Sequence, residues 1–143
     1  MAQNLRINPH DVDLRQGAFR HIALSSGMSQ QTLLPADEAL VLKLLDAAQI
    51  SDAGIVSRTV LHTPEIRVVL FTFADGQELT SHTNRRRAIV QIIQGACDFL
   101  FAGKWQRLET GDLLHLPPNH PHAVRAGAGP FSMLLTLCAE AAN

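Results

Sequence analysis

The 143-residue sequence has no tyrosine, one tryptophan and only two cysteines. Two cysteines are too few for the disulfide framework that stabilises many small secreted domains. Cys97 and Cys138 both lie in apolar segments, so we interpret them as small buried side chains, with a disulfide between them as the alternative. The composition therefore does not indicate an oxidising compartment.

Charge of one sign is also lacking, since charged residues make up 17% and the net charge is -1. Such a chain has no general attraction to nucleic acid or to anionic membranes. No apolar run reaches the ~20 residues that a membrane span needs. The first 16 residues contain no apolar stretch typical of a signal peptide. We therefore expect a cytoplasmic protein that binds neither nucleic acid nor membrane.

The length indicates one structural domain with a buried core of its own. Within it, residues 1–54 are expected to form an N-terminal arm and a helix that pack on a barrel formed by residues 55–143. The helix is predicted over residues 36–49, since Pro35 suits a first helical turn and apolar residues follow at helical spacing. Short edge strands are expected within residues 21–34.

After residue 54 the pattern changes to short runs rich in β-branched and aromatic residues, separated by turn signals. Eight strands are predicted over residues 55–62, 66–74, 88–94, 97–102, 105–108, 113–116, 122–125 and 132–137. So many short strands at close spacing favour an antiparallel sandwich or barrel. The predicted fold class is mainly β.

Two glycine-initiated motifs stand out in the strand region. The first places Gly76, His82, Asn84, Ala88 and Gly95 with five, one, three and six residues between them. The second places its markers with five, one, two and three residues between them, and these are Gly111, Pro117, Asn119, His122 and Ala126. Each motif contributes one histidine.

In this spacing the chain resembles the cupin superfamily, and specifically its small single-domain bacterial members with an RmlC-like jelly roll. The resemblance covers about residues 55–138. It implies a double-stranded β-helix with a pocket inside the barrel, and often a homodimer. It also implies a metal site whose ligands are three histidines and a glutamate, at positions occupied here by His82, Asn84, Ala88 and His122.

Only two of those four positions can supply a strong metal ligand. Oxygenase iron is usually held by two histidines and a carboxylate, and catalytic zinc by three protein ligands. Ala88 supplies none and Asn84 only a neutral oxygen, so His82 and His122 are expected to bind a divalent metal (Zn, Ni, Fe or Cu) weakly. The alternative is that both are metal-free pocket histidines.

His82 and His122 are also the best candidates for catalytic residues, because histidine exchanges protons near neutral pH. Three functions remain open from the sequence. The first is binding of a small organic ligand in the pocket, with no assigned reaction. The second is catalysis, by a metal-dependent dioxygenase or a metal-free isomerase, and the third is a sensing or structural module.

An arginine run follows His82, and a further arginine follows His122. We expect Asn84, Arg85, Arg87 and Arg125 to contact the ligand, since guanidinium groups bind carboxylate and phosphate through paired hydrogen bonds. This pattern indicates an anionic small-molecule ligand. The alternative is a solvated loop, or ion pairs with acidic residues nearby.

The strand over residues 88–94 indicates how the barrel packs. If Ala88 faces inward, then Val90 and Ile92 do too, while Ile89 and Ile93 face outward. Two outward isoleucines favour either packing against the helix or a homodimer. A homodimer is the expected partner state.

Overall fold

The computed structural model describes residues 31–140 apart from residues 51 and 53. The expectations for residues 1–30 lie outside these limits, and residues 31–34 form no strand. The described residues contain nine strands and one short helix, with bounds α2 Leu44–Ala47, β1 Ile55–His62, β2 Ile66–Phe73, β3 Glu78–His82, β4 Ala88–Gln94, β5 Ala96–Phe101, β6 Lys104–Glu109, β7 Leu113–Leu116, β8 His122–Ala126 and β9 Phe131–Cys138.

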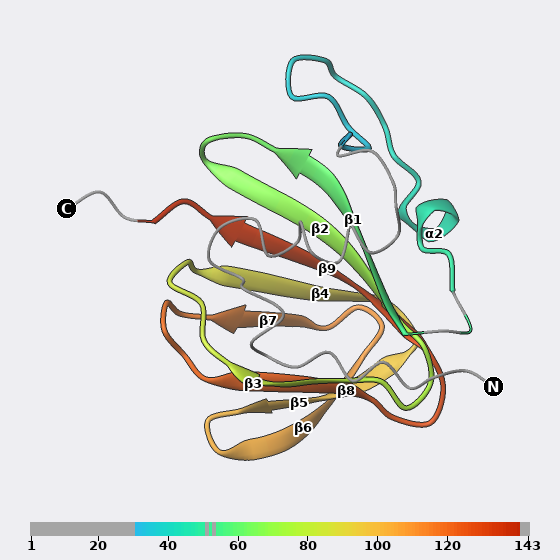
Figure 1. Cartoon of the computed structure of the whole chain (residues 1–143), viewed down its shortest axis with the longest axis vertical. Coiled ribbons are helices and arrows are strands. Elements are labelled where there is room, and N and C mark those ends of the chain that lie inside the picture. Colours follow the sequence, from blue (N-terminus) through green and yellow to red (C-terminus); the bar gives the residue numbers. More distant parts are fainter. Residues whose placement is uncertain (1–30, 51, 53, 141–143) are drawn as a thin grey trace.

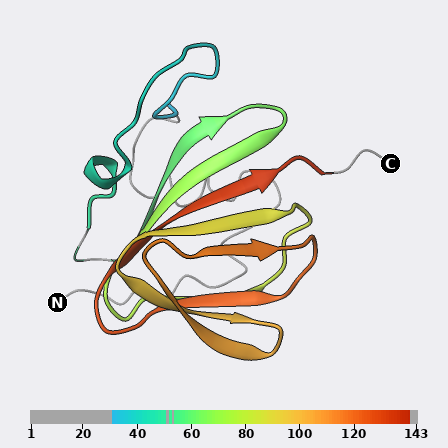
Figure 2. The same ribbon diagram turned by 180° about the vertical axis from the view of Figure 1, so that it is seen from behind.

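The strands form two sheets that enclose the core between them. A five-stranded sheet has the order β1-β2-β9-β4-β7, and a four-stranded sheet has the order β3-β8-β5-β6. Figure 1 shows the two sheets meeting at one end and opening at the other, and Figure 2 shows the same arrangement from behind. The paired strands are antiparallel, and strands distant in sequence alternate across each sheet. This is the predicted mainly-β double-stranded β-helix.

Strand alternation produces the core. On β4, Ala88, Val90 and Ile92 are buried between the sheets, whereas the residues between them face outward, as predicted. Phe73 ends β2 and Phe131 begins β9, and their rings stack with centroids 4.5 Å apart. Burying one such side chain contributes roughly 1.5–3 kcal/mol.

All eight predicted strands are present, with bounds within one residue or so, but β3 was not predicted. Its sequence, ELTSH, has one apolar residue, and only Leu79 at its start is buried. Period-two patterning therefore gives almost no signal. β3 forms because it pairs with β8, which the local sequence cannot indicate.

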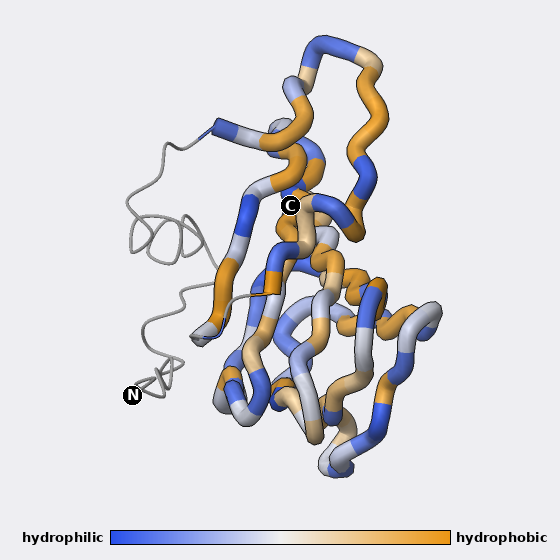
Figure 3. The backbone as a smooth tube through the Cα atoms, turned by 90° about the vertical axis from the view of Figure 1, so that its right-hand side faces the viewer, coloured by the Kyte–Doolittle hydropathy of each residue, from blue (hydrophilic) through white to orange (hydrophobic). Residues whose placement is uncertain are grey.

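The N-terminal helix is present but much shorter than predicted. Within residues 36–49 only α2 is helical, and Lys43 just before it has extended backbone angles. The preceding chain instead spreads over the outer face of the large sheet, where the backbone N–H groups of Leu33 and Leu34 donate to carbonyls of β1. Leu42 packs on the cluster that contains Val60. These tertiary contacts outweigh the helix propensity, because a short helix is marginal on its own. Figure 3 shows hydrophobic residues recurring along this arm.

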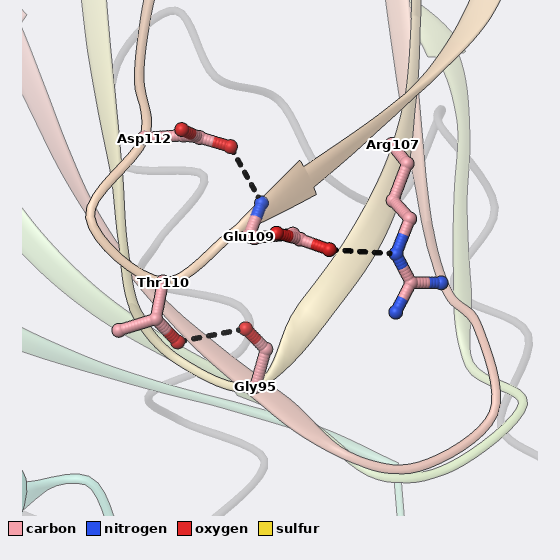
Figure 4. A network of polar contacts seen from close by, with 5 residues as sticks. All are labelled: Gly95, Arg107, Glu109, Thr110 and Asp112. Carbon is pink, nitrogen blue, oxygen red and sulfur yellow. Dashed lines mark hydrogen bonds and ion pairs between the residues drawn. The ribbon is translucent and has the colours of Figure 1, made fainter.

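The turn between β6 and β7 fixes the start of the second glycine motif. Asp112 accepts a hydrogen bond from the backbone N–H of Glu109 at 2.7 Å, and the Thr110 hydroxyl donates to the carbonyl of Gly95 at 2.9 Å (Figure 4). Gly111, between them, has φ 95°, a conformation that glycine adopts without strain. The turn thus joins the end of the first motif, Gly95, to the start of the second, Gly111.

The expectations for cysteine and for membrane spans can both be compared with the structure. Cys97 and Cys138 are free thiols, so the disulfide alternative is wrong. Cys97 is buried in the core, and burial raises the pKa of its thiol to about 12, which keeps it protonated and unreactive. No helix in the described part of the chain is long and apolar enough to cross a membrane.

Candidate ligand-binding site

The two motif histidines lie side by side in the structure. His82 ends β3 and His122 begins β8, and the two residues pair directly in the register of these strands. Their imidazole rings are 4.2 Å apart between centroids and meet edge to face at 65°. The sequence prediction that strands bring these histidines together is therefore confirmed.

Hydrogen bonds to the backbone determine the tautomer of both rings. Nδ1 of His82 lies 2.8 Å from the carbonyl oxygen of Thr80, and Nδ1 of His122 lies 2.8 Å from that of His120. A carbonyl oxygen only accepts, so each Nδ1 must carry the proton. Each neutral ring therefore keeps its lone pair on Nε2. Nε2 of His82 is buried and has no hydrogen-bond partner among the described residues.

Both rings favour the neutral form. Burial lowers the pKa of His82, and the hydrogen bond to Thr80 offsets this only partly. Burial, and then the neighbouring His82 ring, lower the pKa of His122 to about 4. At neutral pH the pair therefore offers two hydrogen-bond acceptors rather than two positive charges.

The histidines line one end of a hollow between the two sheets. Its other walls are apolar, and include Ala88 and Val90 of β4, Phe99 of β5 and Met133 of β9. Its empty volume is about 390 Å³ with the open mouth included, but only about 20 Å³ admits the centre of a water molecule. The hollow therefore has room for about one water molecule in this conformation.

Asn84 lines the same hollow, but its side chain also organises the loop. Its Oδ1 accepts from the backbone N–H of Arg86 at 2.9 Å, and its carbonyl accepts from Asn119 at 2.6 Å. The second bond joins the two motifs directly. Asn119 has φ 63°, which asparagine tolerates better than most residues. The oxygen proposed as a weak ligand is therefore already used by the backbone.

The residues do not fit the complete cupin metal centre. Ala88 faces the hollow at the position of the family glutamate, and it is 3% exposed. In the part of the chain described, no group of three or more histidine, cysteine, aspartate or glutamate residues is placed to hold a metal. Two Nε2 lone pairs remain, which is an incomplete ligand set.

Arg85 and Arg87 do not face the hollow. Both are exposed, and they alternate with the buried residues Asn84 and Ala88. The guanidinium of Arg87 contacts the ring of His115, which pairs with the outward-facing Ile89. Neither arginine lines the hollow, so the structure gives no support for placing them at its mouth.

Arg125 also lies away from the hollow. On β8 it alternates with His122 and Val124, which line the hollow, so it occupies the outer face of the small sheet. There Nε lies 3.4 Å from the Asp98 carboxylate, and the guanidinium stacks 3.9 Å from the centroid of the Trp105 ring. The structure explains Arg125 through these outer contacts, and the expectation that it flanks the mouth is wrong.

Sequence reasoning missed Arg67, which lies next in the strand register to Leu137 of the hollow. Arg67 on β2 is two residues before the core residue Val69, so it faces inward, and it contacts His62 of β1. An arginine at an inward position of a strand was the available signal. The signal was hard to recognise because the first three residues of β2 are all half-buried, so burial does not alternate there.

Comparison with known proteins agrees with this architecture. Residues 68–142, more than half of the chain, match the family model described as the AraC-like ligand binding domain. No curated protein matches the chain.

Solved structures share the fold over most of the chain. A cupin superfamily protein from Desulfitobacterium hafniense is 22% identical, with a TM-score of 0.66, covering 78% of this chain and 100% of that one. A conserved protein of unknown function from Streptococcus pyogenes is 25% identical, with a TM-score of 0.66 and coverage of 78% and 97%. An RmlC-like cupin from Desulfovibrio desulfuricans is 27% identical, with a TM-score of 0.64 and coverage of 71% and 97%. The chain therefore belongs to the AraC-like ligand-binding domain family of the cupin superfamily.

Proposed function

We propose that this protein binds a small organic molecule between the two sheets and carries out no reaction on it. The observation that carries the proposal is Nε2 of His82, a buried acceptor without a partner in the described part of the chain. A buried polar atom without a hydrogen bond costs about 1–3 kcal/mol, and a bound ligand would recover part of that cost. The matched family, described as a ligand binding domain, supports the same function.

The chemistry of the histidine pair specifies one end of the ligand. Both Nε2 atoms accept, so the ligand must present a donor there, such as a hydroxyl or an N–H group. The narrow part of the hollow must widen for any ligand larger than water. Met133 is the flexible side chain in this wall and the one best able to move.

The catalytic alternatives have less support from the residues. A dioxygenase centre of the two-histidine type requires a carboxylate, and none of the described residues that line the hollow supplies one. A metal-free isomerase usually adds a carboxylate or a tyrosine to the histidine, and the chain has no tyrosine. A sensing role is compatible with ligand binding, and it requires a partner that responds to the bound state.

The proposal is tested by screening small alcohols, polyols and hydroxy acids for stabilisation of the tag-free protein. Compounds that bind should shift the ring nitrogen NMR signals of His82 and His122. Their affinity should fall at least about tenfold in a His82→Leu variant, because the hydrogen bond to the ligand is lost.

The matched control is His115→Leu, which removes an exposed histidine on the outer face of the same barrel. Its affinities should equal those of the wild type. Equal binding by the wild type and the His82→Leu variant would contradict the proposal.

A second candidate function is weak binding of a divalent metal (Zn, Ni, Fe or Cu) by the Nε2 atoms of His82 and His122. It is favoured by the fixed tautomers, which leave both lone pairs available for coordination. Zinc titration of chelator-treated, tag-free protein should give an affinity that His122→Leu abolishes and His115→Leu preserves. The same zinc affinity in all three proteins would exclude this candidate.

The homodimer and the cytoplasmic location also remain proposals. Ile93 packs against the cluster beneath the arm, so it no longer argues for a dimer. Support comes instead from the arm, where Val41 is 92% and Leu45 62% exposed. The two free thiols are compatible with a reducing compartment.

A further inference from the structure

The large sheet carries a basic cluster at one end of its inner face. One row of paired residues runs across this end, and paired residues share a face of the sheet. In order across the strands, the row consists of His62, Arg67, Leu137, Ala88 and Leu116. Its last three members line the hollow. Arg67 is therefore beside the hollow, next to Leu137 in the register.

Arg86 approaches the same place from the loop before β4. Between His82 and Ala88 the even-numbered residues are at least half-buried, whereas Thr83, Arg85 and Arg87 are exposed. Arg86 is half-buried and its Nε is fully buried, and it lies in the chain between Asn84 and Ala88, both of which line the hollow. The bond from its backbone N–H to Asn84 holds this part of the loop.

Arg67 contacts His62 directly, and the charge of Arg86 also acts on that ring. Nη2 of Arg67 donates to Nε2 of His62 at 3.2 Å. Burial, and then the charges of Arg67 and of Arg86, lower the pKa of His62. His62 thus remains a neutral acceptor that orients Arg67, and it adds no positive charge to the cluster.

The charge of Arg86 is not compensated within the described chain. Its Nε is buried and has no hydrogen-bond partner there, and Arg86 makes no ion pair with any described residue. Two guanidinium groups near one another repel, and burying a donor without an acceptor is costly. A cluster of this kind is stabilised by an oxyanion, which accepts the N–H groups of both arginines.

We propose that Arg86 and Arg67 form a subsite for an oxyanion group, a carboxylate or a phosphate, of the molecule bound in the hollow. The inference rests on the proposed function, since it concerns the other end of the same ligand. The ligand then has two kinds of polar group. A hydroxyl or N–H group meets the histidine pair, and the oxyanion lies at the row of Arg67.

The test uses lactate, its neutral amide lactamide, and inorganic phosphate as probes of the full chain. In the wild type, lactate should bind at least about tenfold more tightly than lactamide, and it should shift the Nε–H NMR signal of Arg86. Arg86→Gln and Arg67→Gln should each remove most of that preference. Displacement of lactate by phosphate below equimolar concentration would identify phosphate as the better group, and weaker displacement would identify carboxylate.

Arg85→Gln is the matched control, because it changes the net charge equally at an exposed position of the same loop. It should leave lactate binding within about twofold of the wild type, since surface charges contribute little. Equal affinities for lactate and lactamide in the wild type would overturn the proposal. An equal loss in the Arg85→Gln and Arg86→Gln variants would overturn it as well.

The same titrations separate this subsite from the proposed function. Shifts at His82 and His122 with both lactate and lactamide, but no effect of Arg86→Gln, would leave the proposed function standing and overturn the oxyanion subsite. NMR shifts at Arg86 without any at the histidines would support the oxyanion subsite. They would contradict the proposed contact of the ligand with His82 and His122. No shift at either group with any probe would overturn both.

Discussion

At the scale of single residues, the candidate site depends on which nitrogen of each histidine carries the proton. The carbonyls of Thr80 and His120 hold both protons on Nδ1, so the two Nε2 atoms remain acceptors in an apolar hollow. The same burial makes protonation unfavourable. Ala88 places no carboxylate in the hollow, and Asn84 uses its side-chain oxygen to bind the loop backbone.

The pKa shift of His122 predicts how stability depends on pH. Its pKa falls from 6.5 to about 4 on folding, chiefly through burial. Above pH 6.5 the group is neutral in both states and has no effect. As the pH falls below 6.5 the unfolded chain takes up the proton first, so the free energy of unfolding decreases by up to about 1.4 kcal/mol per pH unit until pH approaches the folded value.

Urea unfolding of the metal-free protein at several pH values between 7.5 and 4 measures this decrease. A His122→Gln variant should show a smaller decrease, whereas His115→Gln should follow the wild type. His82, whose pKa is lowered in the same direction, accounts for part of the remaining slope. Parallel curves for the wild type and the His122→Gln variant would contradict the assignment.

At the scale of elements, the hairpin joining β4 to β5 packs tightly against the chain at the start of β9. Gly95 has φ 74°, and a Cβ at this position would lie 2.5 Å from the carbonyl oxygen of Pro130. A glycine is needed here for both its conformation and its lack of a side chain. β9 begins at the next residue, Phe131, so a shift at Gly95 would move the start of a central strand.

Gly95→Ala is therefore expected to destabilise the protein more than the matched variant Gly103→Ala. Gly103 has φ 75°, but nothing lies within 4 Å of the added Cβ. Both substitutions incur roughly 1–2 kcal/mol of backbone strain. Gly95→Ala should cost a further ~1–3 kcal/mol through steric overlap. Chemical unfolding measures the difference, and equal losses would show that the Pro130 contact relaxes without cost.

At the scale of the whole molecule, the arm determines which surface remains apolar. Residues 31–50 cover part of the large sheet, with Ala47 and Ala48 buried against Val60 and Leu70. Other apolar residues of the arm project outward and are exposed: Leu40, Val41, Leu45 and Ile50. This surface is the basis for expecting a homodimer.

If the arm forms the contact between two copies, then Val41→Asp and Leu45→Asp should each weaken association at least about tenfold, since a charge would be buried at the interface. Sedimentation velocity over a range of concentrations gives the dissociation constant. Leu113→Asp is the matched control, since Leu113 is 61% exposed at the start of β7. A monomer at micromolar concentration in the wild type would rule out the dimer.

The sequence by itself determined the strand segments, the fold and the meeting of His82 with His122. Period-two alternation and glycine spacing are local properties, and motif spacing fixes which strand ends coincide. Only the tertiary structure decided the rest. β3 forms because β8 pairs with it. Most of the predicted helix does not form because the arm makes contacts with the sheet instead. Arg125 lies on the outer face of the small sheet and Arg85 and Arg87 are exposed, because the direction of a side chain depends on strand register and loop geometry, which residue type alone does not encode.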